Sequence, residues 1–351
     1  MQVDRNLMRE TTRGFQKYYN PKLNGELRLD TNTNVLGSNP AAEKYLREHS
    51  WDLNGYPNTY SDGLRQALAD LYGLEADNII AGNGSDEMLD VIFKTFMDMG
   101  DNSVVPVPSY TLYDYFVKLN GGKALEVDLT EDFQLDVDAM VKQDAKIAIM
   151  PSPNNPTGNC FRTKDVEEIL SRFNGIVVFD EAYAEYSDNP FISRAEEFDN
   201  LVVLRTFSKA YAMAALRVGY AVANKKLADM MICVKIPYSL NMVSEGAAIA
   251  AVKDQEFVRR SVQMVKEQRP KLDAGLRKLG FETFPSDSNF ILARSPIDHK
   301  VLVDGLKQRG VLIRDFGAKR RTENCIRTTV GTEEHNALLL EKAEEVISGC
   351  R

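Results

Sequence analysis

Between residues 78 and 222, short apolar runs alternate with longer stretches in which apolar residues recur every three or four positions. The short runs have the length of β-strands, and several are rich in the β-branched residues that are typical of strands buried on both faces. Seven strands are expected, at residues 78–81, 104–107, 124–127, 147–150, 176–179, 202–204 and 218–222. Strands that alternate with helices predict an α/β fold with a largely parallel sheet covered by helices.

A long amphipathic helix is expected next, from Gln255 to Leu279, with Gly280 marking its end. Pro270 lies inside it and predicts a kink or break, because proline lacks the amide hydrogen. Short strands at 281–284, 290–292, 311–313 and 325–328 then alternate with helices at 299–309 and 333–347. We therefore expect a large domain at 31–253, a smaller α+β domain at 254–351, and a first segment, 1–30, that forms an arm and part of the small domain.

Lys209 is the first candidate for chemistry. It follows an expected strand, with Thr206 and Ser208 just before it and Arg217 eight residues after it. An amine between hydroxyls and an arginine suits an aldehyde cofactor that carries a phosphate, because the amine can form a Schiff base while the other groups bind the phosphate. Pyridoxal 5′-phosphate is such a cofactor. For this motif alone, the alternative is that Lys209 and Arg217 are ordinary residues on a solvent-exposed surface, since lysine and arginine are mostly exposed.

Asp180 directly follows the apolar run 176–179. In open α/β sheets, ligands bind at the carboxyl ends of such strands. A carboxylate there can keep a pyridine nitrogen protonated, so that the ring withdraws electrons from the substrate. An aspartate that caps a following helix is the alternative for Asp180 alone. Its combination with Lys209 favours the cofactor site.

Two loops that follow expected strands complete this pattern. In the segment 151–158, three prolines, two asparagines and a glycine predict a rigid turn, in which Asn155 can donate to a cofactor oxygen. In the segment 82–87, Gly84 and Ser85 precede an expected helix from about Met88 to Met99. Glycines that open a helix leave backbone N–H groups free to bind phosphate. An ordinary strand-to-helix turn is the alternative for this second loop.

The motifs, in order, are Gly84-Ser85-Asp86-Glu87, Pro108-Ser109-Tyr110, Ser152-Pro153-Asn154-Asn155-Pro156-Thr157-Gly158, Asp180-Glu181-Ala182-Tyr183, Ser208-Lys209-Ala210 and Arg217. Together they resemble the fold-type I, class II-like aminotransferases, and within them most closely the histidinol-phosphate aminotransferases. The resemblance extends from Leu29 to Gly331. It implies a large domain with a mostly parallel seven-stranded sheet, a smaller α+β domain, pyridoxal phosphate as cofactor, and a homodimer.

The resemblance also implies roles for individual residues. Lys209 would carry the cofactor and move the proton, Asp180 would pair with the pyridine nitrogen, and Tyr183 would contact the ring hydroxyl. The implied cofactor ligands are Gly84, Ser85, Asp86, Tyr110, Asn155, Asp180, Tyr183, Thr206, Ser208, Lys209 and Arg217, with Tyr56 of a neighbouring subunit. The implied substrate ligands are Arg314, Arg327, Asn289, Asn32 and Tyr19, where Tyr18 is the alternative to Tyr19.

The implied reaction transfers an amino group from histidinol phosphate to 2-oxoglutarate. A threonine-phosphate decarboxylase and an aromatic amino-acid aminotransferase remain the alternatives. The chain departs from the family at Asn32-Thr33-Asn34-Val35, where Asn-Glu-Asn-Pro is common, and at Ala212 and Ala215, where many members have glycine.

Composition excludes several other classes of protein. At 351 residues with 44% hydrophobic residues, the chain can form two cores, and its net charge of −8, without a basic block, argues against a nucleic-acid partner. No apolar stretch reaches the ~20 residues that span a bilayer. Four scattered cysteines and three histidines form no metal or redox motif, so we expect no metal and a cytoplasmic protein with reduced thiols.

Overall fold

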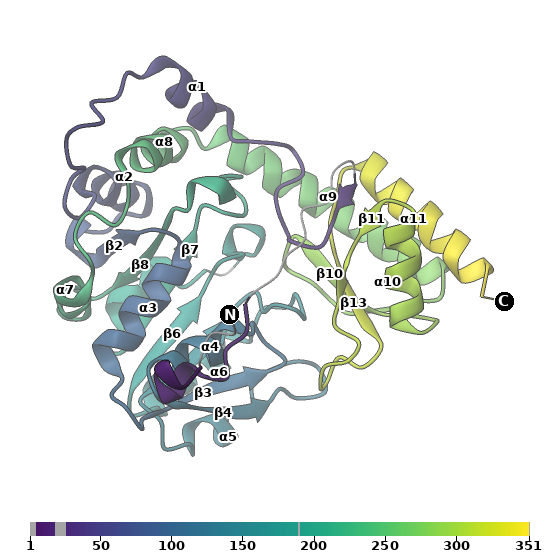
Figure 1. Cartoon of the computed structure of the whole chain (residues 1–351), viewed down its shortest axis with the longest axis horizontal. Helices are drawn as coiled ribbons and strands as arrows, with labels where there is room; N and C mark the ends of the chain where they lie inside the picture. Colours follow the sequence, from purple (N-terminus) through teal and green to yellow (C-terminus); the bar gives the residue numbers. More distant parts are fainter. Residues whose placement is uncertain (1–4, 18–25, 189, 351) are drawn as a thin grey trace.

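A seven-stranded sheet lies at the centre of the larger part of the molecule (Figure 1). The structure is a computed structural model and describes residues 5–17, 26–188 and 190–350. The sheet has the strand order β2-β8-β7-β6-β5-β3-β4, and all neighbouring strands are parallel except that β8 runs antiparallel to both of its neighbours. The strands are β2 (Ile79–Gly82), β3 (Asn102–Val107), β4 (Lys123–Asp128), β5 (Ile147–Pro151), β6 (Ile176–Asp180), β7 (Leu201–Thr206) and β8 (Gly219–Ala223). The predicted mainly parallel sheet of seven strands is confirmed.

The central strands are buried on both faces. In β6, Val177 and Phe179 belong to one apolar cluster, whereas Val178 belongs to a second cluster on the other face. β7 alternates in the same way, with Val203 in the first cluster and Val202 in the second. Because successive side chains of a strand point to opposite faces, an uninterrupted apolar run is the pattern that two covered faces require.

Two groups of helices cover these faces. Buried residues of α3 (Ser85–Phe96), α4 (Leu112–Leu119) and α7 (Lys225–Val234) share the second cluster. Buried residues of α2 (Asp62–Tyr72), α5 (Val137–Val141), α6 (Thr163–Arg172) and α8 (Met242–Lys253) share the first. Helix α1 (Pro40–Glu48) packs on α8 (Figure 1). Helix α3 begins three residues earlier than the apolar pattern predicts, because its first turn carries polar residues.

The C-terminal part contains a small antiparallel sheet with the strand order β12-β13-β10-β9 (Figure 1). Its elements are α9 (Glu256–Lys278), β9 (Glu282–Thr283), β10 (Phe290–Arg294), α10 (His299–Gln308), β11 (Val311–Leu312), β12 (Arg314–Asp315), β13 (Cys325–Thr329) and α11 (Glu333–Ser348). Near the N-terminus, β1 (Leu27–Arg28) pairs in parallel with β11. The division into domains at residues 30 and 253 stays a prediction.

Of the kink or break predicted at Pro270, the break is wrong, since α9 continues through the proline. Proline cannot donate to the carbonyl of Lys266, but both residues are exposed, so water can bond the carbonyl that is left free. Val265 and Leu272, on the opposite side of the helix, are buried in the first cluster. Their burial stabilises the helix on both sides of the proline.

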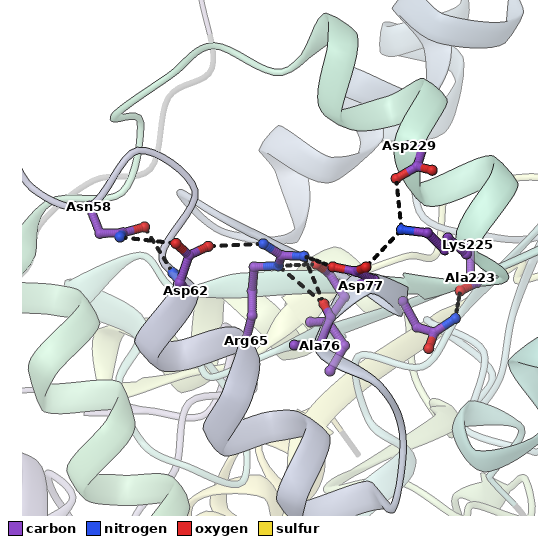
Figure 2. A network of polar contacts seen from close by, with 10 residues as sticks. Asn58, Asp62, Arg65, Ala76, Asp77, Ala223, Lys225 and Asp229 are labelled. Atoms are coloured by element: carbon purple, nitrogen blue, oxygen red, sulfur yellow. Dashed lines mark hydrogen bonds and ion pairs between the residues drawn. The ribbon is translucent and has the colours of Figure 1, made fainter.

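Arg65 joins α2 to the first strand of the sheet (Figure 2). Its guanidinium donates to the carbonyl oxygens of Ile79 (2.8 Å) and Ala76 (2.9 Å) and contacts the carboxylates of Asp62 (2.9 Å) and Asp77 (3.3 Å). The Arg65 side chain is only 10% exposed, whereas both carboxylates are largely in solvent. Its hydrogen bonds to the two carbonyls therefore contribute most of its stabilising effect.

We expect Arg65→Met to lower the free energy of unfolding by about 2–4 kcal/mol, because several acceptors lose one buried donor. Lys225→Met is the matched control, since Lys225 contacts Asp77 in the same network (2.7 Å) but is 60% exposed (Figure 2). Its urea midpoint should match that of the wild type. Equal midpoints for both variants would contradict the role given to Arg65.

Candidate active site

The carboxyl ends of β5, β6 and β7 meet at one edge of the sheet. Asp180 is the last residue of β6, Asn155 lies in the loop after β5, and Lys209 lies in the loop after β7. Because the three strands are parallel neighbours, these residues share that edge although 54 residues separate the first from the last. This is the position at which ligands bind in open α/β sheets.

Asp180 is a buried carboxylate, 6% exposed. Its oxygens accept hydrogen bonds from the Tyr113 hydroxyl (2.7 Å) and from the Ala182 amide (3.0 Å). Burial raises the pKa of Asp180 from its ordinary value of 3.8 to about 6, against the opposing effect of the Tyr113 hydrogen bond. A cationic group beside Asp180 would relieve this unfavourable burial. Tyr113 was not identified from the sequence, where it is one of several aromatic residues in an amphipathic helix.

Lys209 lies beside Tyr183 and the segment that precedes α1. Its Nζ donates to the Thr31 carbonyl (3.1 Å) and lies 5.3 Å from the centroid of the Tyr183 ring. The Tyr183 hydroxyl in turn accepts from Asn32 Nδ2 (3.0 Å). Within the part of the chain that the structure describes, no carboxylate forms an ion pair with Lys209. The hydrogen bond to Thr31 thus holds the amine in place, while the described residues supply no ion-pair partner for it.

Asn34 is a second residue that sequence reasoning missed. Its Nδ2 donates to the Ala210 carbonyl (3.1 Å) and to the Ser261 hydroxyl (2.6 Å), so it joins the Lys209 loop to α9. The signal that could have identified it is the motif of residues 32–35, in which Asn34 retains the second asparagine of the family pattern.

The first turn of α3 faces the loop after β7. Gly84 precedes α3 with φ +87°, and no side chain caps that helix. A Cβ on Gly84 would lie 2.8 Å from the Arg217 guanidinium, and a Cβ on Gly219 would lie 2.2 Å from the Ser85 amide. Only glycine fits at these two positions, so the N-terminus of α3 approaches β8 and Arg217 closely.

The remaining phosphate candidates lie around this turn. Ser208 Oγ accepts from Thr206 Oγ1 (3.0 Å) and from Arg217 Nη1 (3.4 Å). Arg217 Nη2 donates to the Asp86 carboxylate (3.1 Å), and both of these side chains are about 40% exposed. Hydroxyls, a guanidinium and free helical N–H groups are the donors that a phosphate monoester requires.

Two candidate substrate residues, Arg327 and Arg314, lie on the small sheet, and Asn289 directly precedes its strand β10. Arg327 of β13 is 6% exposed, and it donates to Asn155 Oδ1 (2.5 Å) and to the Asp30 carbonyl (2.7 Å). Burial lowers the pKa of Arg327 to about 10, so it remains charged at neutral pH. The Asn289 amide donates to the Asn32 carbonyl (3.2 Å).

Arg314 of β12 lies directly opposite Arg327 in the antiparallel register, and it is exposed. Arg327 Nε and Asn289 Oδ1 are buried and have no hydrogen-bond partner. Unsatisfied buried polar atoms beside two arginines are consistent with a site for an anionic ligand.

Besides Tyr183, three other tyrosines are predicted site residues: Tyr110, Tyr56 and Tyr19. The Tyr110 ring contacts Tyr113 edge-on, with centroids 5.5 Å apart, which places it near Asp180. Tyr56 is 84% exposed, and its ring packs on Tyr238 of the same chain (5.1 Å). No polar contact joins Tyr56 to the described phosphate candidates of its own chain. Tyr19, and its alternative Tyr18, lie outside the described residues.

The residues present fit pyridoxal phosphate. They supply an amine at Lys209, a buried carboxylate that favours a cationic neighbour at Asp180, and a glycine turn with hydroxyls and Arg217 for the phosphate. The described residues include no group of three or more His, Cys, Asp or Glu that could hold a metal ion. None of the described helices could cross a membrane.

Residues 24–342 match the family described as aminotransferase class I and II, and the chain belongs to that family. The histidinol-phosphate aminotransferase of Thermoanaerobacter sp. (strain X514) is 35% identical over 349 residues, which are 97% of this chain and 99% of the relative. Histidinol-phosphate aminotransferase 1 of Archaeoglobus fulgidus is 37% identical over 326 residues, 92% of this chain and 100% of the relative.

Among solved structures, histidinol-phosphate aminotransferase from Sinorhizobium meliloti in complex with pyridoxal 5′-phosphate superposes with a TM-score of 0.86 at 25% identity. The match covers 93% of this chain and 92% of that one. The resemblance inferred from the motifs, the fold-type I architecture and the aminotransferase class are confirmed.

We expect apo Asp180→Asn to be more stable than the apo wild type above pH 6, by about 1–2 kcal/mol. The raised pKa means that the folded wild type loses stability as the pH rises from about 4 to about 6, because the buried carboxyl must ionise. The asparagine has no charge to bury, so the two proteins should differ less at pH 4.5 than at pH 8. Thermal unfolding of both apoproteins at the two pH values measures this. A difference independent of pH would contradict the buried charge.

Proposed function

We propose that the protein transfers the amino group of L-histidinol phosphate to 2-oxoglutarate, with pyridoxal phosphate as cofactor. The products are imidazole acetol phosphate and L-glutamate, and the reaction belongs to histidine biosynthesis. The named relatives support this function at 35% and 37% identity over most of their length. The observation that carries it is the position of two arginines, Arg314 and Arg327, beside the edge that holds Asp180 and Lys209.

Pyridoxal phosphate, when bound, supplies an electron-withdrawing ring that acidifies the substrate Cα–H. We assign Lys209 Nζ as the amine that binds it and that removes and returns the proton at the substrate carbon. Asp180 would hold the ring nitrogen protonated, and Asn155 and Tyr183 would orient the ring hydroxyl. Tyr110 would lie against the ring face.

The phosphate of the cofactor would be bound by Arg217 and the hydroxyls near it. The full set of phosphate ligands proposed is Gly84, Ser85, Thr206, Ser208 and Arg217, with Asp86 orienting the guanidinium. Their hydrogen bonds support this set, because Ser208, Thr206 and Arg217 already form one connected group.

Arg327 would bind the anionic group of either substrate. Its buried, planar guanidinium suits both a carboxylate and a phosphate, since each presents two oxygens to a fork of N–H donors. Arg314 would add a second positive charge, and Asn289, Asn32 and Tyr19 would line the remainder of the substrate site.

We also propose a homodimer in which Tyr56 reaches the cofactor phosphate of the partner subunit. The support is an exposed apolar surface formed by segments 53–56 and 236–238, where Leu53, Tyr56 and Ile236 are 78%, 84% and 66% exposed. The rings of Tyr56 and Tyr238 pack against each other, with centroids 5.1 Å apart, so the two segments form one surface. Large exposed apolar groups are typical of interfaces.

Two further features of the proposal concern location and architecture. All four cysteines are unpaired, which supports a reducing, cytoplasmic location. We propose that residues 31–253 and 254–351 form separate domains, with the segment 1–30 as an arm and part of the smaller one.

The function is tested by assaying purified protein with 2-oxoglutarate and one amino donor at a time. We expect histidinol phosphate to be preferred over phenylalanine, and threonine phosphate to release no carbon dioxide. Lys209→Ala is the inactive control. Preference for phenylalanine, or carbon dioxide from threonine phosphate, would replace the proposal with an aromatic aminotransferase or a decarboxylase.

Arg327→Ala should lower kcat/KM for both histidinol phosphate and glutamate by roughly 30- to 1000-fold, since one charge-assisted pair of hydrogen bonds is worth about 2–4 kcal/mol. Arg314→Ala should affect the dianionic phosphate more than glutamate. Arg320→Ala, a change at another exposed arginine near the small sheet, should have little effect on either substrate. Equal losses for Arg314→Ala with both donors would contradict its assignment.

The dimer is tested by mixing Tyr56→Ala with Lys209→Ala, both with low activity alone. A two-fold dimer with shared sites predicts that hybrid dimers regain one site with both native residues. Sedimentation should show a dimer for each variant. A fully active monomer, or no recovery in verified hybrids, would contradict a contribution of Tyr56 to the partner's site.

A further inference from the structure

Two cationic side chains lie over the ring of Phe316, and a third, that of Arg314, lines the same hollow as this ring. The guanidinium carbon of Arg327 lies 5.4 Å from the ring centroid, and Lys319 Nζ lies 5.5 Å from it. Arg314 is the direct partner of Arg327 across β12 and β13. Residues directly opposite each other in an antiparallel pair project from the same face of the sheet. Lys319 lines the same hollow as Arg314 and contacts the same ring as Arg327, so it borders the candidate substrate site.

Among the described residues, no acidic side chain forms an ion pair with Lys319 or Arg314. Within residues 5–17, 26–188 and 190–350, neither side chain forms an ion pair or a hydrogen bond. The contact recorded for the Lys319 ammonium group is a cation–π contact with the ring of Phe316. Burial, and then the charge of Arg314, lower the pKa of Lys319. Two like charges that repel each other favour an anion that binds both.

The acids around Lys319 have other partners. Asp315 Oδ1 accepts from the Gly317 amide (2.8 Å) and contacts His299 Nδ1 (2.7 Å). In the neighbouring groove, Glu126 forms an ion pair with Arg320 (3.5 Å). Asp114, which also lines that groove, pairs with Lys118 (2.6 Å).

Lys319 lies where two hollows adjoin. It lines one hollow together with Arg314 and Phe316, and a second together with Tyr110 and Pro156. Pro156 follows Asn155, whose side chain accepts the hydrogen bond from Arg327. The ammonium group thus borders the candidate active site on the side of the small sheet.

We propose that Lys319 is a specificity-determining residue that, with Arg314, binds the phosphate group of the amino donor. The inference rests on the proposed function. A carboxylate carries one negative charge, which the fork of Arg327 can neutralise, whereas a phosphate monoester carries close to two charges and a third oxygen. Lys319 supplies the additional charge as a compact, mobile donor. It therefore distinguishes the phosphorylated donor from glutamate in a site that must accept both.

The test compares Lys319→Met with Lys319→Arg and Arg320→Met, each as the cofactor-loaded enzyme. Arg320 is the matched control, since it is an adjacent exposed cation whose charge is taken up by Glu126 and Asp128. For Lys319→Met we expect KM for histidinol phosphate to rise about 10-fold. This factor corresponds to the lower end of the free energy of a charge-assisted hydrogen bond, because solvent screens the charges at a partly exposed site. The kcat, and the KM for glutamate, should stay within about 2-fold, since Arg327 neutralises a single carboxylate. Lys319→Arg should restore a KM near that of the wild type.

An unchanged KM for histidinol phosphate in Lys319→Met would overturn the inference, as would an equal rise for glutamate or the same effect in Arg320→Met. Inorganic phosphate, as a competitive inhibitor against glutamate, gives a second measurement that requires no phosphorylated donor. Its inhibition constant should rise in Lys319→Met alone. If the wild type rejects histidinol phosphate, the proposed function fails, while this inhibition still decides whether Lys319 binds phosphate.

Discussion

The parallel pairing of β5, β6 and β7 is the constraint on which the candidate active site depends. Parallel neighbours end at the same edge, so Asn155, Asp180 and Lys209 come together from three separate loops and strand ends. The Ser152 amide bonds the Asp180 carbonyl (2.9 Å), which extends the β5–β6 ladder into the loop that carries Asn155. Backbone hydrogen bonds therefore set the spacing of the site, and the two apolar clusters hold the sheet that supplies them.

A short segment before α1 connects this edge to the small sheet. The Leu29 carbonyl accepts from the Thr329 amide (2.8 Å), and the Asp30 carbonyl accepts from Arg327 (2.7 Å). A residue later, the Thr31 carbonyl accepts from Lys209 Nζ (3.1 Å). One extended stretch thus contacts both the amine and the substrate arginine. Its hydrogen bonds fix the distance between the two groups that a substrate must bridge.

The site retains polar groups whose burial is not fully compensated within the chain. Asp180 is held in a place that disfavours its charge, and Arg327 Nε and Asn289 Oδ1 lack partners. Each such group destabilises the folded chain until a ligand of opposite character binds. A ligand that pairs with these groups binds more tightly because it removes this unfavourable burial. The site is therefore lined by buried polar residues that would only destabilise a purely structural core.

The sequence by itself determined the class of fold and most of its strands, and it placed the candidate cofactor residues at strand ends. Uninterrupted β-branched runs are favourable only in strands covered on both faces, and Lys209, Asp180 and Asn155 follow such runs at strand ends. These properties depend on neighbours in the chain, so they can be inferred from local pattern.

Only the tertiary structure decided how the C-terminal cations are arranged and that α9 continues through Pro270. Pro270 does not interrupt α9, because packing of Val265 and Leu272 outweighs the local loss of one hydrogen bond. Nothing in the chain distinguishes Lys319 from other lysines, since its unneutralised charge depends on which acids the fold places elsewhere. Burial, register across strands and charge partners arise from residues far apart in the sequence, and local pattern does not contain them.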